Sequence, residues 1–171
     1  LGLMLCQALP NALLTAIEMD TAACMDIEFN FAQVAWKDRV HFLQQKIQDW
    51  ESEQTFDLII VNPPFFNAHL LSVAENRKQA RHDLSLSKEV LCQALLQRLK
   101  PDGIACVMYP ESEWEDWQNL ISKTVFKTLS VYKIKPNINK PINRSIGFYS
   151  KIQTHQLENK ELMIYDKENN Y

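Results

Sequence analysis

Strand-like apolar runs alternate with helix-like segments along most of this chain, and the alternation limits the folds that it can adopt. Strands are predicted at residues 14–19, 40–43, 56–61, 104–109 and 126–135, with a return arm at 145–152 and a short edge strand at 162–165. Helices are predicted at 3–9, 21–35 and 111–122, and from Ser85 or Ser87 to 99. The pattern indicates an α/β fold with a doubly wound, mostly parallel sheet that ends in an antiparallel hairpin.

Two local features refine this prediction. The run at 56–61 is of the kind that is buried on both faces of a parallel sheet. The residues Lys100-Pro101-Asp102-Gly103 have the composition of a turn, and Asp20 is predicted to cap the helix that begins at Thr21.

The composition suits one globular domain spanning residues 1–171, because 46% of the residues are hydrophobic and 23% are charged. No apolar run reaches the length of about 18 residues that a membrane span needs, and residues 1–14 lack the positive flank of a signal peptide. We therefore expect a cytoplasmic protein with no membrane partner. The cysteines Cys6, Cys24, Cys92 and Cys106 are widely spaced in apolar segments, which predicts reduced core residues and no metal site.

The charge is distributed unevenly along the chain. The formal net charge is −3, yet residues 117–157 contain no Asp or Glu. The basic residues of this stretch are Lys123, Lys127, Lys133, Lys135, Lys140, Arg144 and Lys151. If the stretch folds as one unit, it forms a basic face on an acidic protein; the alternative is a solvated edge with a chance bias.

The segment Asn62-Pro63-Pro64-Phe65, directly after the strand at 56–61, is the most specific signal for function. Two prolines fix two φ angles and donate no amide hydrogens, so the local carbonyls are rigid acceptors. If the Asn62 side-chain oxygen and the Pro63 carbonyl each accept one N–H of an adenine amine, the nitrogen lone pair is directed at an electrophilic methyl group. Phe65 would stack on the base, which contributes about 1 to 3 kcal/mol. The alternative is a turn whose residues only pack.

A second candidate is Glu18, which closes the strand at 14–19. Ligands of open α/β sheets bind beyond the carboxyl ends of the strands, where an acid can accept bonds from both ribose hydroxyls of a nucleoside cofactor. An acid at this position is also a common helix cap.

The chain resembles a known family at several of these motifs. Phe56–Phe66 is similar to the catalytic motif of class I, Rossmann-like methyltransferases that use S-adenosylmethionine. More narrowly, the chain resembles the bacterial family that methylates N6 of the adenosine 3′ of the anticodon in a valine tRNA. The further matching segments are 80–87, 99–103, Lys135-Pro136 and 140–144. The resemblance covers nearly the whole chain and implies a seven-stranded sheet, with the anticodon stem-loop of a tRNA as partner.

The resemblance also implies roles for individual residues. Glu18 becomes the ribose-binding acid, Met19 a flank of the cofactor adenine, and Asn62 to Phe65 the target-base site, with Asn62 also beside the cofactor. In the loop after the third strand of the family, which follows the strand at 40–43 here, members often carry an acid that binds the cofactor adenine. Lys46 stands at that position, and Asp49, three residues on, is assigned the role instead. Positive charge in the loop at 67–84 and in the terminal hairpin suggests RNA contacts by Arg77, Arg81, His82, Lys140 and Arg144. The alternative for Arg81 and His82 is a place beside the next helix with internal hydrogen bonds, and the alternative for Lys140 and Arg144 is solvated surface charge.

The glycine-rich first strand and loop of the family are expected to precede Leu1, and more chain is expected after Tyr171. In this topology the first strand lies between the strands at 14–19 and 56–61. Its loss would leave backbone groups unpaired, at about 1 to 3 kcal/mol each. Direct pairing of those two strands would contradict this expectation.

Other functions remain open at this point. Glutamine methyltransferases of release factors also use Asn-Pro-Pro, usually followed by Tyr, and Phe65 disfavours them. DNA adenine methyltransferases generally carry an added recognition domain. A different class is a non-catalytic RNA-binding module.

Overall fold

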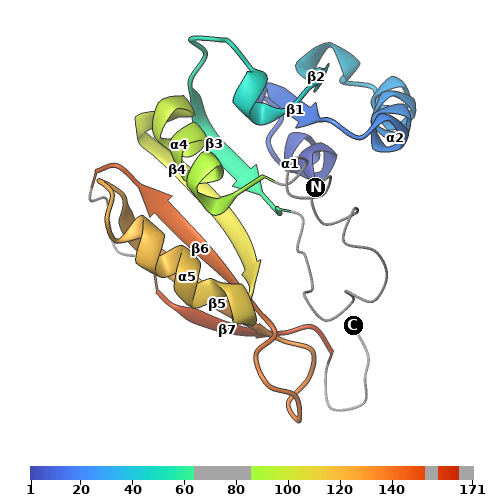
Figure 1. Cartoon of the computed structure of the whole chain (residues 1–171). Coiled ribbons are helices and arrows are strands. Elements are labelled where there is room, and N and C mark those ends of the chain that lie inside the picture. Colours follow the sequence, from blue (N-terminus) through green and yellow to red (C-terminus); the bar gives the residue numbers. More distant parts are fainter. Residues whose placement is uncertain (64–85, 153–157, 166–171) are drawn as a thin grey trace, which may run out of the picture. The chain divides into compact units, whose positions relative to one another are not determined.

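The computed structural model describes residues 1–63, 86–152 and 158–165. The chain divides into two compact units, Leu1–Ser52 and Glu53–Tyr171, and each is described by itself. The expectation of a single domain stays a prediction. Figure 1 shows the helices and strands of both units.

The first unit contains a parallel two-stranded sheet. Its elements are α1 (Gly2–Ala8), β1 (Leu14–Glu18), α2 (Thr21–Ala32), the 3-10 turn η1 (Lys37–Arg39), β2 (Val40–Gln44) and the 3-10 turn η2 (Ile47–Asp49). The sheet pairs Leu14 with Val40 at one end and Glu18 with Gln44 at the other. Asp20 caps α2 as predicted, since its Oδ1 accepts a 2.9 Å hydrogen bond from the Ala23 amide. The helix ends at Ala32, earlier than the predicted residue 35.

Arg39 ties α1 to the start of β2. Its guanidinium donates hydrogen bonds to the carbonyls of Cys6, Leu9 and Ala12, at 2.9 to 3.2 Å. The Cys6 carbonyl lies in the last turn of α1, where carbonyls lack partners within the helix, so the guanidinium satisfies a group that would otherwise need water. The guanidinium also lies 5.8 Å from the ring centroid of Trp36.

The second unit contains a mixed five-stranded sheet with the strand order β3-β4-β6-β5-β7. Its elements are β3 (Phe56–Val61), α4 (Lys88–Arg98), β4 (Leu99–Pro110), α5 (Glu111–Ile121), β5 (Lys127–Lys135), β6 (Arg144–Ser150) and β7 (Lys160–Met163). The β3–β4 and β5–β7 pairs are parallel, and β6 is antiparallel to both β4 and β5. The α/β class and the antiparallel hairpin are thereby confirmed. Ser87, one of the two predicted caps, accepts from the Val90 amide at 3.2 Å and begins α4.

The predicted turn at Lys100-Pro101-Asp102-Gly103 is wrong, because these residues belong to β4. They form an irregularity within the strand: between the pairs Phe56–Leu99 and Leu58–Ile104, β4 advances five residues while β3 advances two. Lys100 bridges this irregularity with hydrogen bonds of 2.8 and 2.9 Å to the Asp57 carboxylate. The hydrogen bond from Lys100 lowers the pKa of Asp57.

Burial of β3 on both faces is also not observed. Leu58 is 39% exposed, because β3 lies at the edge of its sheet and pairs only with β4 within the described residues. Within the residues that the structure describes, β1 pairs only with β2. The sequence predicts a further strand between β1 and β3, and direct pairing of these two strands would contradict it. The described strands show no such pairing. The intervening strand itself stays a prediction.

The core of the second unit lies between the sheet and its two helices. Both α4 and α5 pack on the face that carries Ala105, Val107, Tyr109 and Tyr149 (Figure 1). Trp117, fully buried on α5, donates a 3.0 Å hydrogen bond to the Tyr149 hydroxyl. Gln118 donates a second one at 2.5 Å. The buried hydroxyl is therefore satisfied and joins α5 to β6.

The four cysteines are free thiols. Three of them are buried and Cys106 is half-buried, which confirms the prediction of reduced core residues. Burial raises the pKa of the Cys106 thiol to about 11. Within the described residues, none of the helices is long and apolar enough to cross a membrane.

Gly147 has no space for a side chain. A Cβ at this position would lie 2.0 Å from Oη and 2.3 Å from Cζ of Tyr149, which cannot retreat because it is fully buried. We expect Gly147→Ala to lower the free energy of unfolding by about 2 to 4 kcal/mol, measured by urea denaturation. Gly2→Ala is the control, since its Cβ meets only the end of the Leu14 side chain, at 2.8 Å. Equal midpoints for the two variants would contradict the packing described here.

Candidate functional site

The carboxyl end of the parallel β3–β4 pair carries the candidate target-base residues. Val61, the last residue of β3, pairs with Val107 of β4. Asn62 and Pro63 follow directly, with Asn62 exposed and Pro63 buried. A buried proline fixes the backbone on which the exposed amide of Asn62 is presented. The predicted acceptors therefore lie at the strand ends, where open α/β sheets bind their ligands.

The remainder of the predicted motif lies outside the described residues. This applies to Pro64 and Phe65 and to three of the candidate RNA-binding residues, Arg77, Arg81 and His82. Their roles stay predictions.

The candidate cofactor residues of the first unit lie at the carboxyl ends of β1 and β2. Glu18 ends β1, and its Oε1 accepts hydrogen bonds from the amides of Met19 (2.7 Å) and Asp20 (2.9 Å). These two bonds hold the carboxylate in one orientation at the start of α2. The Glu18 carbonyl accepts from the Gln45 amide at 2.9 Å, which ties the end of β1 to the residue after β2.

Met19 and Asp49 lie at the same end of this sheet. Met19 is 37% exposed, so its side chain is available to a ligand. Asp49 is exposed at the end of η2, and its amide donates to the Lys46 carbonyl at 3.1 Å. Lys46 is half-buried. The structure thus brings Glu18, Met19 and Asp49 to one edge of the two-stranded sheet, and their binding roles stay predictions.

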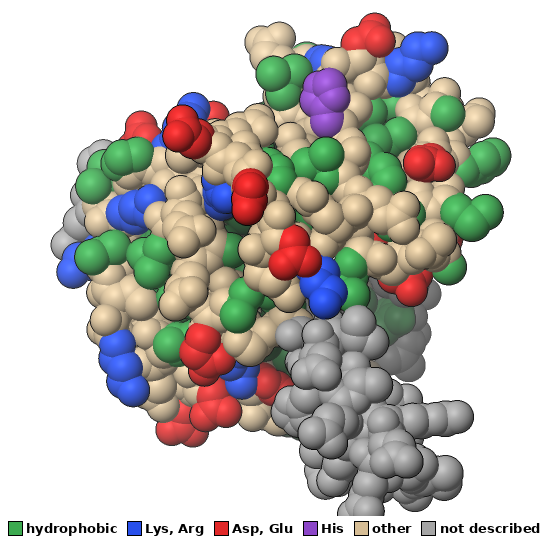
Figure 2. Space-filling model, turned by 45° about the horizontal axis from the view of Figure 1, so that its top comes forward, with side chains coloured by type: hydrophobic (Ala, Val, Ile, Leu, Met, Phe, Trp, Pro, Cys, Tyr) green, Lys and Arg blue, Asp and Glu red, His purple; other side chains and the backbone are tan. Residues whose placement is uncertain are grey.

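The basic stretch does not form a single face. Lys127 lies at the start of β5, whereas Arg144 pairs with Ile134 near the end of this strand, about 23 Å away at 3.3 Å per residue. Acids that are distant in the sequence neutralise two of the lysines: Lys135 lies 2.6 Å from Glu161, and Lys133 lies 3.9 Å from Glu111. In the view of Figure 2, basic and acidic side chains are interspersed.

Two cations of the stretch lie at the same end of the five-stranded sheet as the target-base residues. Arg144 pairs with Pro110 at the carboxyl end of β4, two strands from β3, and both Arg144 and Lys140 are exposed.

The two units also differ in charge. Residues 1–52 hold seven Asp and Glu against three Lys and Arg, a formal charge of −4, whereas residues 53–171 carry +1. The candidate RNA contacts therefore fall in the less acidic unit.

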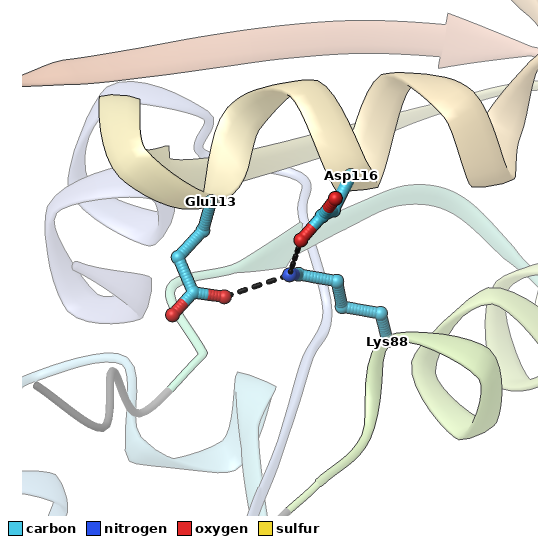
Figure 3. Close-up of polar contacts among 3 residues, drawn as sticks. All are labelled: Lys88, Glu113 and Asp116. Carbon is cyan, nitrogen blue, oxygen red and sulfur yellow. Dashed lines mark hydrogen bonds and ion pairs between the residues drawn. The ribbon is translucent and has the colours of Figure 1, made fainter. Parts of the chain in front are cut away.

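Lys88 is a residue that the sequence did not reveal. It is the first residue of α4, and its Nζ lies 2.7 Å from Glu113 and 3.5 Å from Asp116 of α5 (Figure 3). The same ammonium lies 5.7 Å from the ring centroid of Tyr109, one residue before the end of β4. Lys88 thus holds the start of α4 against α5 at the edge that bears Asn62. No sequence signal distinguishes it from other lysines, because its partners are brought together by the fold.

The electrostatics of this edge keep its buried tyrosine neutral. Burial raises the pKa of Tyr109, and Glu113 and Glu89 raise it further. Within the described residues there is no group of three or more His, Cys, Asp and Glu side chains placed to hold a metal ion.

Comparisons with known proteins show what the chain is similar to. The family model described as "Methyltransferase small domain" matches residues 1–111. A Vibrio cholerae protein named tRNA1(Val) (adenine(37)-N6)-methyltransferase is 33% identical over 144 residues, which covers 84% of this chain and 60% of that protein. A protein of the same name from Bacteroides thetaiotaomicron is 36% identical over 110 residues, 64% of this chain and 46% of that protein. The chain therefore spans about 60% or less of the length of these relatives.

Solved structures share the fold. A predicted O-methyltransferase from Agrobacterium tumefaciens has a TM-score of 0.71 at 12% identity, with 97% of this chain and 76% of that chain covered. A putative methyltransferase from Streptococcus mutans, solved in complex with SAH, has a TM-score of 0.51 at 13% identity, with 80% and 76% covered. The fold is that of the class I methyltransferases, as the sequence predicts.

The Lys88 contacts lead to a stability prediction. Lys88→Ala removes a cation whose side chain is 20% exposed and which faces two acids and an aromatic ring. We expect the free energy of unfolding to fall by about 1 to 2 kcal/mol in a denaturant titration. The matched control is Lys100→Ala, because its pair with Asp57 is far more exposed and exposed pairs contribute little. An effect at Lys100 equal to that at Lys88 would count against the assignment.

Proposed function

Because the chain belongs to the methyltransferase small domain family, we propose that it transfers a methyl group from S-adenosylmethionine to N6 of an adenine in tRNA. The observation that carries the proposal is the exposed Asn62 on buried Pro63 at the carboxyl end of β3. The similarity to relatives named tRNA1(Val) (adenine(37)-N6)-methyltransferase supports the adenine of a valine tRNA beside the anticodon as the target. Such a substrate implies that the protein works in the cytoplasm.

Asn62 and Pro63 orient the amine in this proposal. The adenine amine is a poor nucleophile, because its lone pair is delocalised into the ring. Its two N–H groups donate to Asn62 Oδ1 and to the Pro63 carbonyl, which holds the nitrogen closer to tetrahedral. The same acceptors stabilise the positive charge that develops on the nitrogen. No strong general base is needed, and Phe65 stacks on the base.

The residues of the first unit fit a nucleoside cofactor. Glu18 is already fixed by two backbone amides at the end of β1, so its carboxylate is preorganised to accept from ribose hydroxyls. Met19 and Asp49 lie at the same strand ends and bind the cofactor adenine in this proposal. Asn62 belongs to the second unit, and its place beside the cofactor stays a prediction. S-adenosylmethionine, when bound, supplies the electrophilic methyl group.

The substrate is held through its phosphates. Lys140 and Arg144 are exposed cations at the carboxyl end of the sheet, and neither forms an ion pair within the described residues. Arg77, Arg81 and His82 add to these contacts. Phosphate contacts position an RNA and leave its sequence to be read elsewhere, which suits an anticodon stem-loop with an unstacked adenine.

Asn62→Ala tests the orientation of the amine. We expect kcat for methylation of tRNA to fall about a hundredfold or more, because oriented acceptors act mainly in the transition state. The assay follows labelled S-adenosylmethionine into N6-methyladenosine of total tRNA with the full-length protein. Asn119→Ala, an exposed asparagine on α5, is the control and is expected to retain activity.

The same assay separates the alternatives. Unmethylated release factor is offered in parallel, and label in its glutamine instead of in tRNA would overturn the proposal. A protein that binds tRNA but transfers no label would be a non-catalytic RNA-binding module.

Lys140→Ala and Arg144→Ala test the phosphate contacts. Each is expected to weaken tRNA binding and to reduce the slope of log K against log salt concentration by about 0.7 to 0.9, the value of one phosphate contact. Lys127→Ala, at the opposite end of β5, makes the same change of charge and is expected to leave the slope unchanged. The measurement is a filter-binding or fluorescence titration at several salt concentrations, and identical slopes for all three variants would refute the assignment.

A further inference from the structure

We propose that Glu111 is a positioning residue for Arg144 and for the adjacent loop 136–143, which carries Lys140. The inference rests on the proposed RNA substrate and adds an acid to the group of residues that determine RNA affinity. Glu111 is the first residue of α5 and directly follows the end of β4.

Glu111 binds both chain neighbours of Arg144. Its amide donates a 3.0 Å hydrogen bond to the Asn143 carbonyl. Its carboxylate Oε2 accepts a 2.7 Å hydrogen bond from the hydroxyl of Ser145, which is fully buried. Arg144 itself pairs with Pro110, the residue before Glu111. Both chain neighbours of Arg144 are therefore attached to one residue, Asn143 through its carbonyl and Ser145 through its side-chain hydroxyl.

This attachment determines where Arg144 points. Successive side chains of a strand point to opposite faces of the sheet. With Ser145 held on the face that α5 covers, the exposed Arg144 is directed away from it. A loss of the Ser145 contact leaves a buried hydroxyl without this partner, which favours a shift of the first residues of β6.

The loop before Arg144 is held at both ends. The Asn143 amide donates to the Ile134 carbonyl at 3.0 Å, which adds to the bond that Asn143 accepts from Glu111. At the other end, the Pro136 carbonyl accepts from the Tyr165 amide at 2.9 Å. Lys140 donates its amide to the Asn137 carbonyl within the loop, at 3.2 Å. The contacts of Glu111 are thus part of the support of Lys140 as well as of Arg144.

Removal of Glu111 changes RNA affinity in opposite directions, depending on whether this residue acts through its charge or through its contacts. A carboxylate beside phosphate-binding cations repels RNA, so its removal should strengthen binding if charge alone matters. If Glu111 positions the cations, its removal should weaken binding. Removal of Glu111 also leaves Lys133, whose Nζ lies 3.9 Å from Glu111 Oε1, without this acidic partner, so the local net charge becomes more positive and a loss of affinity is still harder to explain by charge.

The experiment compares four variants of the full-length protein: Glu111→Ala, Glu111→Gln, Ser145→Ala and Glu115→Ala. Binding of tRNA is titrated at several salt concentrations, and KM for tRNA, kcat, the Kd of S-adenosylmethionine and the melting temperature are measured alongside. Glu115→Ala is the matched control, because Glu115 is exposed on the same helix and its loss makes the same change of charge.

We expect Glu111→Ala to weaken tRNA binding about threefold to tenfold and to raise KM for tRNA, with kcat and the Kd of S-adenosylmethionine retained. Its salt slope should fall by up to about one phosphate contact. Ser145→Ala should act in the same direction without any change of charge, and Glu111→Gln, which keeps an acceptor, should restore most of the affinity.

Binding of tRNA by Glu111→Ala as tightly as by Glu115→Ala, or more tightly, overturns the inference. If Glu111→Ala fails to fold, Ser145→Ala decides: affinity and slope equal to those of the unchanged protein overturn the inference, and a loss of both supports it. A failure of the proposed function is distinguishable, because the unchanged protein would then neither bind nor methylate tRNA.

Discussion

The pairing of β4 with a neighbour on each side is the constraint on which the second unit depends. Its parallel ladder with β3 ends at Val61 and Val107, which places Asn62 one residue beyond the sheet. Its antiparallel ladder with β6 ends at Pro110 and Arg144. One strand thereby sets the position of the proposed methyl-acceptor site and of the proposed phosphate contact. A shift of one residue in either ladder would turn the side chains of the moved strand to the opposite face.

The helix layer keeps these ladders in register. Trp117 and Gln118 of α5 both donate to the buried Tyr149 hydroxyl of β6, so the helix is attached to the strand by directional bonds as well as by apolar contact. Gly147 leaves the space that the tyrosine ring occupies. The consequence reaches the functional edge, because α5 begins at Glu111, beside the start of β6. Packing in the core and placement of the surface cation Arg144 are parts of the same arrangement.

Charge acts locally in this molecule. The net charge of −3 comes from residues 1–52, which carry −4, so it says little about the surface that is proposed to bind RNA. Nearby acids pair with Lys133 and Lys135, whereas Lys140 and Arg144 stay exposed at the strand ends. For a proposed polyanionic ligand, the placement of Lys140 and Arg144 at the strand ends matters more than the total charge, because screening limits electrostatic attraction to about 8 Å at physiological salt.

The sequence by itself determined the α/β class, the cap of α2 by Asp20 and the candidate Asn62-Pro63-Pro64-Phe65, because these depend on neighbours a few residues apart. It narrowed the cap of α4 to Ser85 or Ser87, and the structure selected Ser87. Only the tertiary structure decided the rest. It placed Lys100 to Gly103 within β4, since an irregularity in the pairing with β3 accommodates residues that have the composition of a turn. It divided the basic stretch between the two ends of β5 and brought Glu111 and Glu161 to its lysines. It also joined Lys88 to Glu113 and Glu111 to Ser145. The physical reason is that pairing and charge neutralisation act through space, between residues that are far apart in the chain.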